Sequence, residues 1–71
     1  MTPTDLRRHL RTIGWSQDDL AARLAVNDRT VRRWCDGTNE IPENVAGWVA
    51  NLAAEHERMN APDGWVLRMM P

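Results

Sequence analysis

Helix start and stop signals divide this chain into short segments, and these signals limit what it can fold into. Residues 2–5 combine a hydroxyl at the N-cap, proline at the first helical position and an acid three residues after the cap. Similar start signals follow at Ser16, Asn27 and Pro42. Gly14 and Gly37 can end two of the segments in left-handed caps. The chain therefore predicts four helices, over about residues 2–13, 16–24, 27–36 and 42–58.

Apolar residues recur at helical spacing inside each segment. The expected apolar faces are Leu6, Leu10 and Ile13; Leu20, Ala21 and Leu24; Val31, Trp34 and Cys35, which we expect to be buried; and a stripe of Val45, Trp48, Val49, Leu52 and His56. No strand pattern appears before the apolar residues 65–70. The first three helices are too short to be stable alone, so they must form against each other. The prediction is an all-α domain over residues 1–59 and a C-terminal tail over residues 60–71, in which residues 60–64 are typical of a turn.

Chain length and cysteine usage narrow the class of protein. A chain of 71 residues fits one domain and buries only about 60% of its unfolded surface, so it needs extra support. One cysteine excludes an internal disulfide framework, and His9, Cys35 and His56 are too far apart in sequence to suggest a metal site. We expect no cofactor, and oligomerisation is the remaining source of support.

The charges are distributed unevenly. Residues 1–35 carry seven arginines against four aspartates, a net +3, whereas residues 36–71 carry −4. This asymmetry indicates a polyanion partner for the first half, and an ordinary solvated surface would give the same count. All nine basic residues are arginine, which suits phosphates and guanine edges, although a GC-rich coding bias has the same effect.

Residues 16–37, SQDDLAARLAVNDRTVRRWCDG, resemble the helix-turn-helix unit of the Cro/cI-type (XRE-like, lambda-repressor-like) phage and bacterial repressors. The family's apolar positions correspond to Leu20, Leu24, Val26, Val31 and Trp34. Its small residue, where the two helices touch, corresponds to Ala21. Ser16-Gln17, Thr30-Val31 and the Trp-x-x-Gly ending at Gly37 also fit. The resemblance covers residues 3–58 and implies a compact four- to five-helix DNA-binding domain.

The chain departs from the family pattern at two positions. Ala25 stands where the turn usually has glycine, which costs about 1 kcal/mol if the backbone there is left-handed. Cys35 stands where many members have a glutamate paired with an arginine of the first helix. We expect Cys35 to lie near Leu10 instead.

The resemblance implies that the third helix enters the major groove of DNA. The expected base contacts are Asn27, Asp28, Arg29, Arg32 and Arg33, and the expected phosphate contacts are Ser16, Gln17, Thr30 and Asn39. Arg29 and Arg33 share a helix face, where each can bind guanine O6 and N7, so the half-site should be rich in G·C. Asp28 either accepts from cytosine N4 or holds Arg32 in an ion pair, and we favour the ion pair. Whether Arg7, Arg8 and Arg11 attract DNA or form a solvated helix face stays open.

The acidic half carries apolar side chains beyond the needs of a small core. We expect Trp48, Leu52, Trp65 and Leu67 to form a homodimer interface, with intramolecular packing of the tail as the alternative. Two arrangements of the tail stay open, in which it either pairs with its twofold mate as a strand or lies over the core as a flap. A dimer would present two third helices about 34 Å apart to an inverted repeat.

The sequence therefore predicts a homodimeric DNA-binding repressor, with double-stranded DNA as its partner. We expect a cytoplasmic location, because residues 1–9 lack the apolar core of a signal peptide and no apolar run approaches a membrane span. No grouping of residues suggests an enzyme or a small-molecule site. The alternative function is a protein–protein interaction module built on the same helices.

Overall fold

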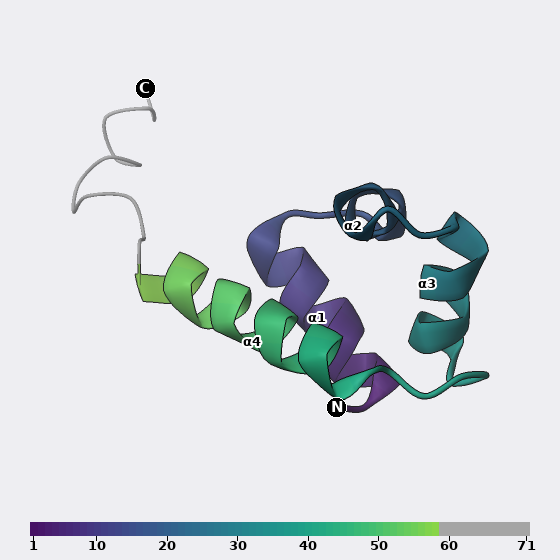
Figure 1. Ribbon diagram of the computed structural model, residues 1–71. Helices are drawn as coiled ribbons and strands as arrows, with labels where there is room; N and C mark the ends of the chain where they lie inside the picture. Colours follow the sequence, from purple (N-terminus) through teal and green to yellow (C-terminus); the bar gives the residue numbers. More distant parts are fainter. Residues whose placement is uncertain (59–71) are drawn as a thin grey trace, which may run out of the picture.

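The computed structural model describes residues 1–58, which form four helices (Figure 1). These are α1 (Pro3–Ile13), α2 (Gln17–Leu24), α3 (Asp28–Asp36) and α4 (Glu43–Arg58). Residues 1–58 contain no strand, so the all-α prediction is confirmed for this part of the chain. The predicted tail, with Trp65 and Leu67, lies outside the described residues.

The predicted caps form the helix starts. Thr2 and Asp5 make a reciprocal capping box at α1, and Ser16 and Asp19 make another at α2. The Asn27 side chain accepts a hydrogen bond from the Arg29 amide, 2.9 Å away, at the start of α3. α4 begins at Glu43, one residue after the predicted Pro42. Local side-chain chemistry thus fixes three of the four helix starts.

Three helices end in left-handed backbone, two of them at the predicted glycines and one at an alanine. Gly14 and Gly37 adopt left-handed backbone, with φ of 85° and 87°. Ala25, at the end of α2, is also left-handed with φ of 55°. Because the backbone at Ala25 is left-handed, the predicted cost of alanine at this turn applies, and it amounts to about 1 kcal/mol.

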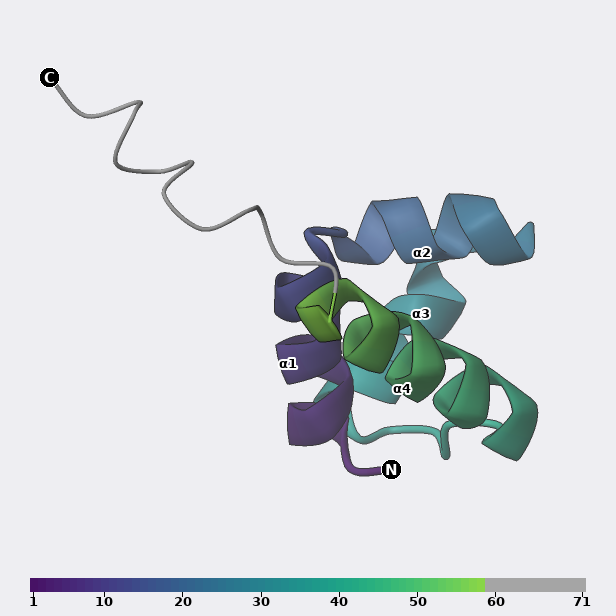
Figure 2. The same cartoon turned by 90° about the vertical axis from the view of Figure 1, so that its left-hand side faces the viewer.

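The helices pack in a connected set, α1 against α4 and α3, and α2 against α3. In Figure 1, α2 is seen end-on and α3 runs from top to bottom in the plane of the view, so the two helices cross steeply. Figure 2 shows α2 lengthwise, with α4 in front of α3. In Figure 1, α3 forms one edge of the molecule and the end of α4 lies toward the opposite edge.

The core confirms most of the predicted buried faces. Its buried members are Leu6, Leu10, Leu20, Ala21, Val31, Trp34, Cys35 and Val49. Cys35 and Leu10 belong to the same buried cluster, as expected. Val26 differs, because 37% of it is exposed after the turn at Ala25.

The predicted stripe of α4 is buried only in part. Val49 and Ala53 are buried, whereas Trp48 is 37% exposed and His56 is exposed. Val49 and Ala53 are four residues apart and lie on one face, and α4 turns this face toward the core. Trp48 lies beside that face, where the Trp15 ring partly covers it.

None of the four helices in residues 1–58 is long and apolar enough to cross a bilayer. Within the same residues, no three His, Cys, Asp or Glu side chains converge where they could hold a metal ion.

Candidate nucleic-acid interface

The third helix has one buried face and one exposed face. Val31, Trp34 and Cys35 are buried against the other helices. The five predicted base-contact residues, Asn27, Asp28, Arg29, Arg32 and Arg33, are all exposed. The structure thus brings the whole predicted set together on the outer side of α3 and at its start.

The charges on this exposed face are partly paired. Arg32 donates to Asp28 over 2.7 Å between Nη2 and Oδ2, which is the ion pair favoured from the sequence. Among the residues described, Arg29 and Arg33 form no ion pair and no side-chain hydrogen bond. They lie one turn apart, so their guanidinium groups are available on the same face.

The two ends of α3 limit what its flanking residues can do. Asn27 uses its side-chain oxygen in the cap, which leaves its NH₂ group for an external acceptor. At the other end, Asp36 accepts from the Thr38 amide at 2.8 Å. Hydrogen bonding to the Thr38 side chain and then to its amide lowers the pKa of Asp36. Asn39 is exposed just after this turn, and its backbone N–H donates to the Arg33 carbonyl at 3.2 Å.

The other predicted phosphate contacts are unequally placed. Gln17 is half-buried at the first turn of α2, and Thr30 is half-buried in α3. The Ser16 hydroxyl accepts from the Asp19 amide at 3.0 Å. Ser16 is therefore already engaged in the cap of α2, whereas the Gln17 carboxamide forms no hydrogen bond within the described residues.

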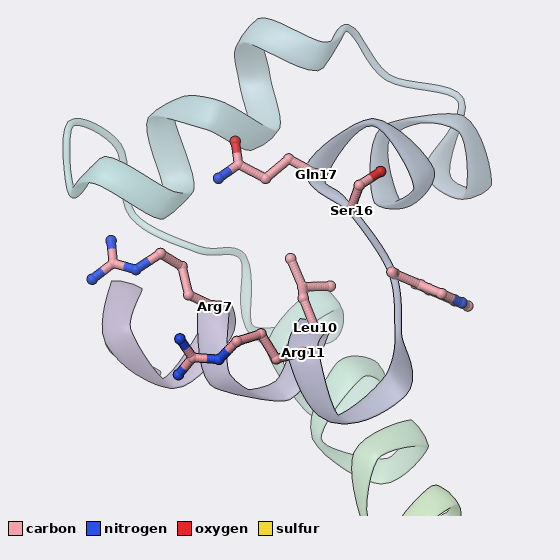
Figure 3. A pocket seen from close by; sticks show the side chains of 6 residues that line it. Arg7, Leu10, Arg11, Ser16 and Gln17 are labelled. Atoms are coloured by element: carbon pink, nitrogen blue, oxygen red, sulfur yellow. The ribbon is translucent and has the colours of Figure 1, made fainter.

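A pocket of about 240 Å³ lies between α1 and the start of α2. Its lining consists of Arg7, Leu10, Arg11, Trp15, Ser16 and Gln17. In Figure 3 the side chains of Arg7, Arg11 and Gln17 extend to the same side, while the Ser16 hydroxyl turns away. The sequence left the role of Arg7 and Arg11 open, and their spacing of four residues was the signal that places both on one face of α1.

The charges around this pocket determine what it can accept. Asp18 and Asp19 lie in the first turn of α2, and Asp19 accepts from the Ser16 amide at 2.8 Å. This hydrogen bond from the Ser16 backbone, followed by the Ser16 side chain, lowers the pKa of Asp19. Arg8 is paired with Asp5 at 2.9 Å, whereas Arg7 and Arg11 form no ion pair within residues 1–58. The two arginines thus offer positive charge beside the start of α2, whose first turn carries Asp18 and Asp19.

Arg7 also makes a contact that the sequence did not predict. Its Nη1 atom donates to the carbonyl of Cys35, in the last turn of α3, and its Nη2 atom donates to the Thr4 hydroxyl at 3.3 Å. Burial raises the pKa of the Cys35 thiol, and the positive charge of Arg7 opposes that shift. α1 is therefore bonded directly to the end of α3.

A second surface lies around two tryptophans. The Trp15 and Trp48 ring centroids are 5.7 Å apart with planes tilted by 50°. The Arg23 guanidinium lies 4.9 Å from the Trp15 ring centroid. Leu52, one turn after Trp48, is half-buried. Of the predicted dimer residues, Trp48 and Leu52 thus share one side of α4.

No protein-family model, no curated protein and no solved structure matches this chain.

Proposed function

We propose that this protein is a sequence-specific DNA-binding regulator of the Cro/cI type, which represses a promoter as a homodimer bound to an inverted repeat. One observation carries the proposal. α3 buries Val31, Trp34 and Cys35 and exposes Arg29 and Arg33, which have no ion-pair partner within residues 1–58. A helix anchored on one side and carrying two unpaired guanidinium groups on the other is suited to the major groove.

Base recognition would rest on these two arginines. A guanidinium group can donate two parallel hydrogen bonds to guanine O6 and N7, and each such contact gives about 1–3 kcal/mol of discrimination. Asp28 would add a carboxylate near the DNA, but its pairing with Arg32 offsets that charge. The expected half-site therefore contains at least one G·C pair for each free arginine.

Phosphate contacts would come from the pocket beside α2 and from the residues around α3. Gln17, Arg7 and Arg11 extend to one side of the pocket, where two cations and a carboxamide can meet a single phosphate group (Figure 3). Thr30 lies in α3 and Asn39 follows its end, so both could contact phosphates beside the groove. Ser16 can still donate its hydroxyl hydrogen. Because counterions are released at each phosphate contact, affinity should fall steeply with salt.

The dimer would form on the side of α4. Trp48 and Leu52 share a surface there, and α3 lies at the edge of the molecule away from the end of α4 (Figure 1). Two copies joined in this way would leave both recognition helices free for half-sites about 34 Å apart. We expect Trp65 and Leu67 to add to this interface. A cytoplasmic repressor of this size fits autoregulation of a phage, mobile-element or antitoxin operon.

Selection from a random duplex library tests the proposal directly. The wild-type protein and the Arg29→Ala/Arg33→Ala variant are selected side by side, after circular dichroism has shown that both are folded. We expect the wild type alone to enrich an inverted repeat that contains G·C pairs. If the folded wild type enriches no sequence, the proposal is wrong.

The competing function is a protein–protein interaction module. The observation that favours it is the exposed side of Trp48 beside Trp15, which is suited to an apolar partner. Salt dependence separates the two functions. Binding to DNA predicts a slope of log K against log salt of about −0.9 for each phosphate contacted, whereas an apolar protein interface responds weakly.

A further inference from the structure

The contact between Arg7 and α3 connects two parts of the molecule that are distant in sequence. The Cys35 carbonyl belongs to the last turn of α3, where helix carbonyls lack partners within the helix. Arg7 donates a hydrogen bond to this carbonyl and brings a positive charge to the negative end of the helix dipole. A charged donor of this kind both caps the helix and fixes its distance from α1.

A second contact brings the same two elements together. Gly37 ends α3 with φ of 87°, and a Cβ atom at this position would lie 3.6 Å from Cγ of Pro3. The start of α1 therefore lies close to the end of α3. α3 also packs against α2, so it is supported by two different helices.

Arg7 also lines the pocket beside α2, together with Arg11 and Gln17, and its guanidinium group bonds to the end of α3. In Figure 3 it extends from α1 toward the end of α3, which is drawn in pale teal. Its two bonds to Cys35 and Thr4 leave further N–H groups for the pocket, because a guanidinium carries five donors. One side chain thus contacts both the end of α3 and the site proposed to receive a phosphate.

We propose that Arg7 is a positioning residue, which fixes the end of α3 that carries Arg33 relative to the pocket formed by Arg7, Arg11 and Gln17. This inference rests on the proposed function, because it concerns the distance between the phosphate-binding pocket and the base contact of Arg33 when both meet one duplex. Arg33 lies two residues before Cys35, so a shift of the last turn moves its guanidinium group directly. Small displacements of this kind weaken a two-bond contact more than a single phosphate contact.

Four variants separate positioning from simple charge. Arg7→Gln removes the positioning contact and the charge, whereas Arg7→Lys keeps the charge. Arg11→Gln removes a pocket cation that forms no hydrogen bond to α3 within residues 1–58, and Arg8→Gln removes an arginine paired with Asp5. Affinity is measured by fluorescence anisotropy for the selected duplex and for an unrelated duplex, over a range of salt concentrations.

We expect Arg11→Gln to weaken both duplexes equally and to reduce the salt slope by about 0.9. Arg7→Gln should also lower the ratio of specific to unrelated affinity by about tenfold, which corresponds to the loss of one charge-assisted hydrogen bond. Arg7→Lys should keep the slope without restoring the ratio, because an ammonium group cannot reproduce the two-pronged contact. Arg8→Gln should change neither quantity. An Arg7→Gln variant that behaves like Arg11→Gln, or full rescue by lysine, overturns the proposal.

Hydrogen exchange without DNA keeps this test independent of the proposed function. Arg7→Gln should speed amide exchange at Cys35, Asp36 and Asn39 relative to Arg8→Gln, because the last turn of α3 opens more often. If the wild type selects no duplex, the proposed function fails while this measurement still reports on Arg7. Unchanged protection of the last turn overturns the positioning role. Arg7→Lys serves for both measurements if Arg7→Gln does not fold.

Discussion

Asp28 and Arg32 form an ion pair across one turn of α3, with 2.7 Å between the carboxylate and guanidinium atoms. Both side chains are more than half exposed, so the pair contributes little to the stability of the fold. The ion pair makes Arg32 differ from the other two arginines of α3. Arg32 is paired with Asp28, whereas Arg29 and Arg33 form no ion pair within residues 1–58.

Replacing Arg33 by alanine should weaken specific DNA binding without unfolding the domain. The side chain is exposed and forms no ion pair within the described residues, so its loss leaves the core unchanged. We expect specific affinity to fall by about 1–3 kcal/mol, as measured by anisotropy against the selected duplex. Arg58→Ala is the matched control, because Arg58 is exposed on α4 and paired with Glu55. Retained specific affinity would show that Arg33 does not contact bases.

Enlarging Ala21 should push α2 and α3 apart. Ala21 is only 4% exposed within the core, and added methylene groups there cost about 1–3 kcal/mol. Thermal melting of Ala21→Leu is compared with that of Ala22→Leu, which carries the same change at the exposed neighbouring position. We expect a lower Tm for Ala21→Leu only. Equal melting temperatures would contradict the close contact at Ala21.

Replacing Ala25 by glycine should stabilise the protein. Ala25 has φ of 55°, where a side chain costs about 1 kcal/mol and glycine is unstrained. The larger entropy of glycine in the unfolded chain reduces this gain. We expect a rise in Tm of up to about 4–8 °C for a domain of this size. Ala22→Gly, inside α2, should lower the Tm, and a fall at both positions would contradict the left-handed turn.

Acid should weaken the helix ends. Hydrogen bonding to the Thr2 side chain and then to the Thr2 amide lowers the pKa of Asp5. In the same way, hydrogen bonds with Ser16 lower the pKa of Asp19, and hydrogen bonds with Thr38 lower the pKa of Asp36. A pKa lowered by folding adds stability above the unfolded value of about 3.9 and loses it as pH falls through the folded value. Thermal melts between pH 7 and pH 2 should therefore show a falling Tm below about pH 4. A triple Asp→Asn variant at these positions should show a smaller fall, and an identical fall would assign the effect elsewhere.

Changing Trp48 should weaken the proposed dimer. Trp48 is 37% exposed and contacts Trp15, so a polar residue here removes apolar surface without opening the core. We expect Trp48→Gln to shift sedimentation equilibrium toward the monomer and to reduce affinity for the full inverted repeat more than for one half-site. Asn51→Gln, exposed on the same helix, is the control. An unchanged dimer would place the interface elsewhere.

The features predicted correctly from the sequence are those that depend on neighbours in the chain. Thr2 with Asp5, and Ser16 with Asp19, lie three residues apart, so the capping geometry follows from the helix itself. The Asp28–Arg32 pair spans one turn and follows from the same periodicity. The burial of Val31, Trp34 and Cys35 was also predictable, because only one face of a short helix can meet a small core.

Contacts between helices were decided by the tertiary structure. The rotation of α4 about its axis determines that Ala53 is buried and that Trp48 is 37% exposed, and apolar spacing alone allowed a different stripe. The bond between Arg7 and the Cys35 carbonyl joins residues 28 positions apart, and no local pattern indicates it. Short-range hydrogen bonds and helical periodicity, which follow from the sequence, set where the helices begin and end and which face of α3 is exposed. The packing of α1 against α3 and α4 sets which arginine bonds to the end of α3 and how far Trp48 is exposed, because these features depend on how whole helices are placed in space.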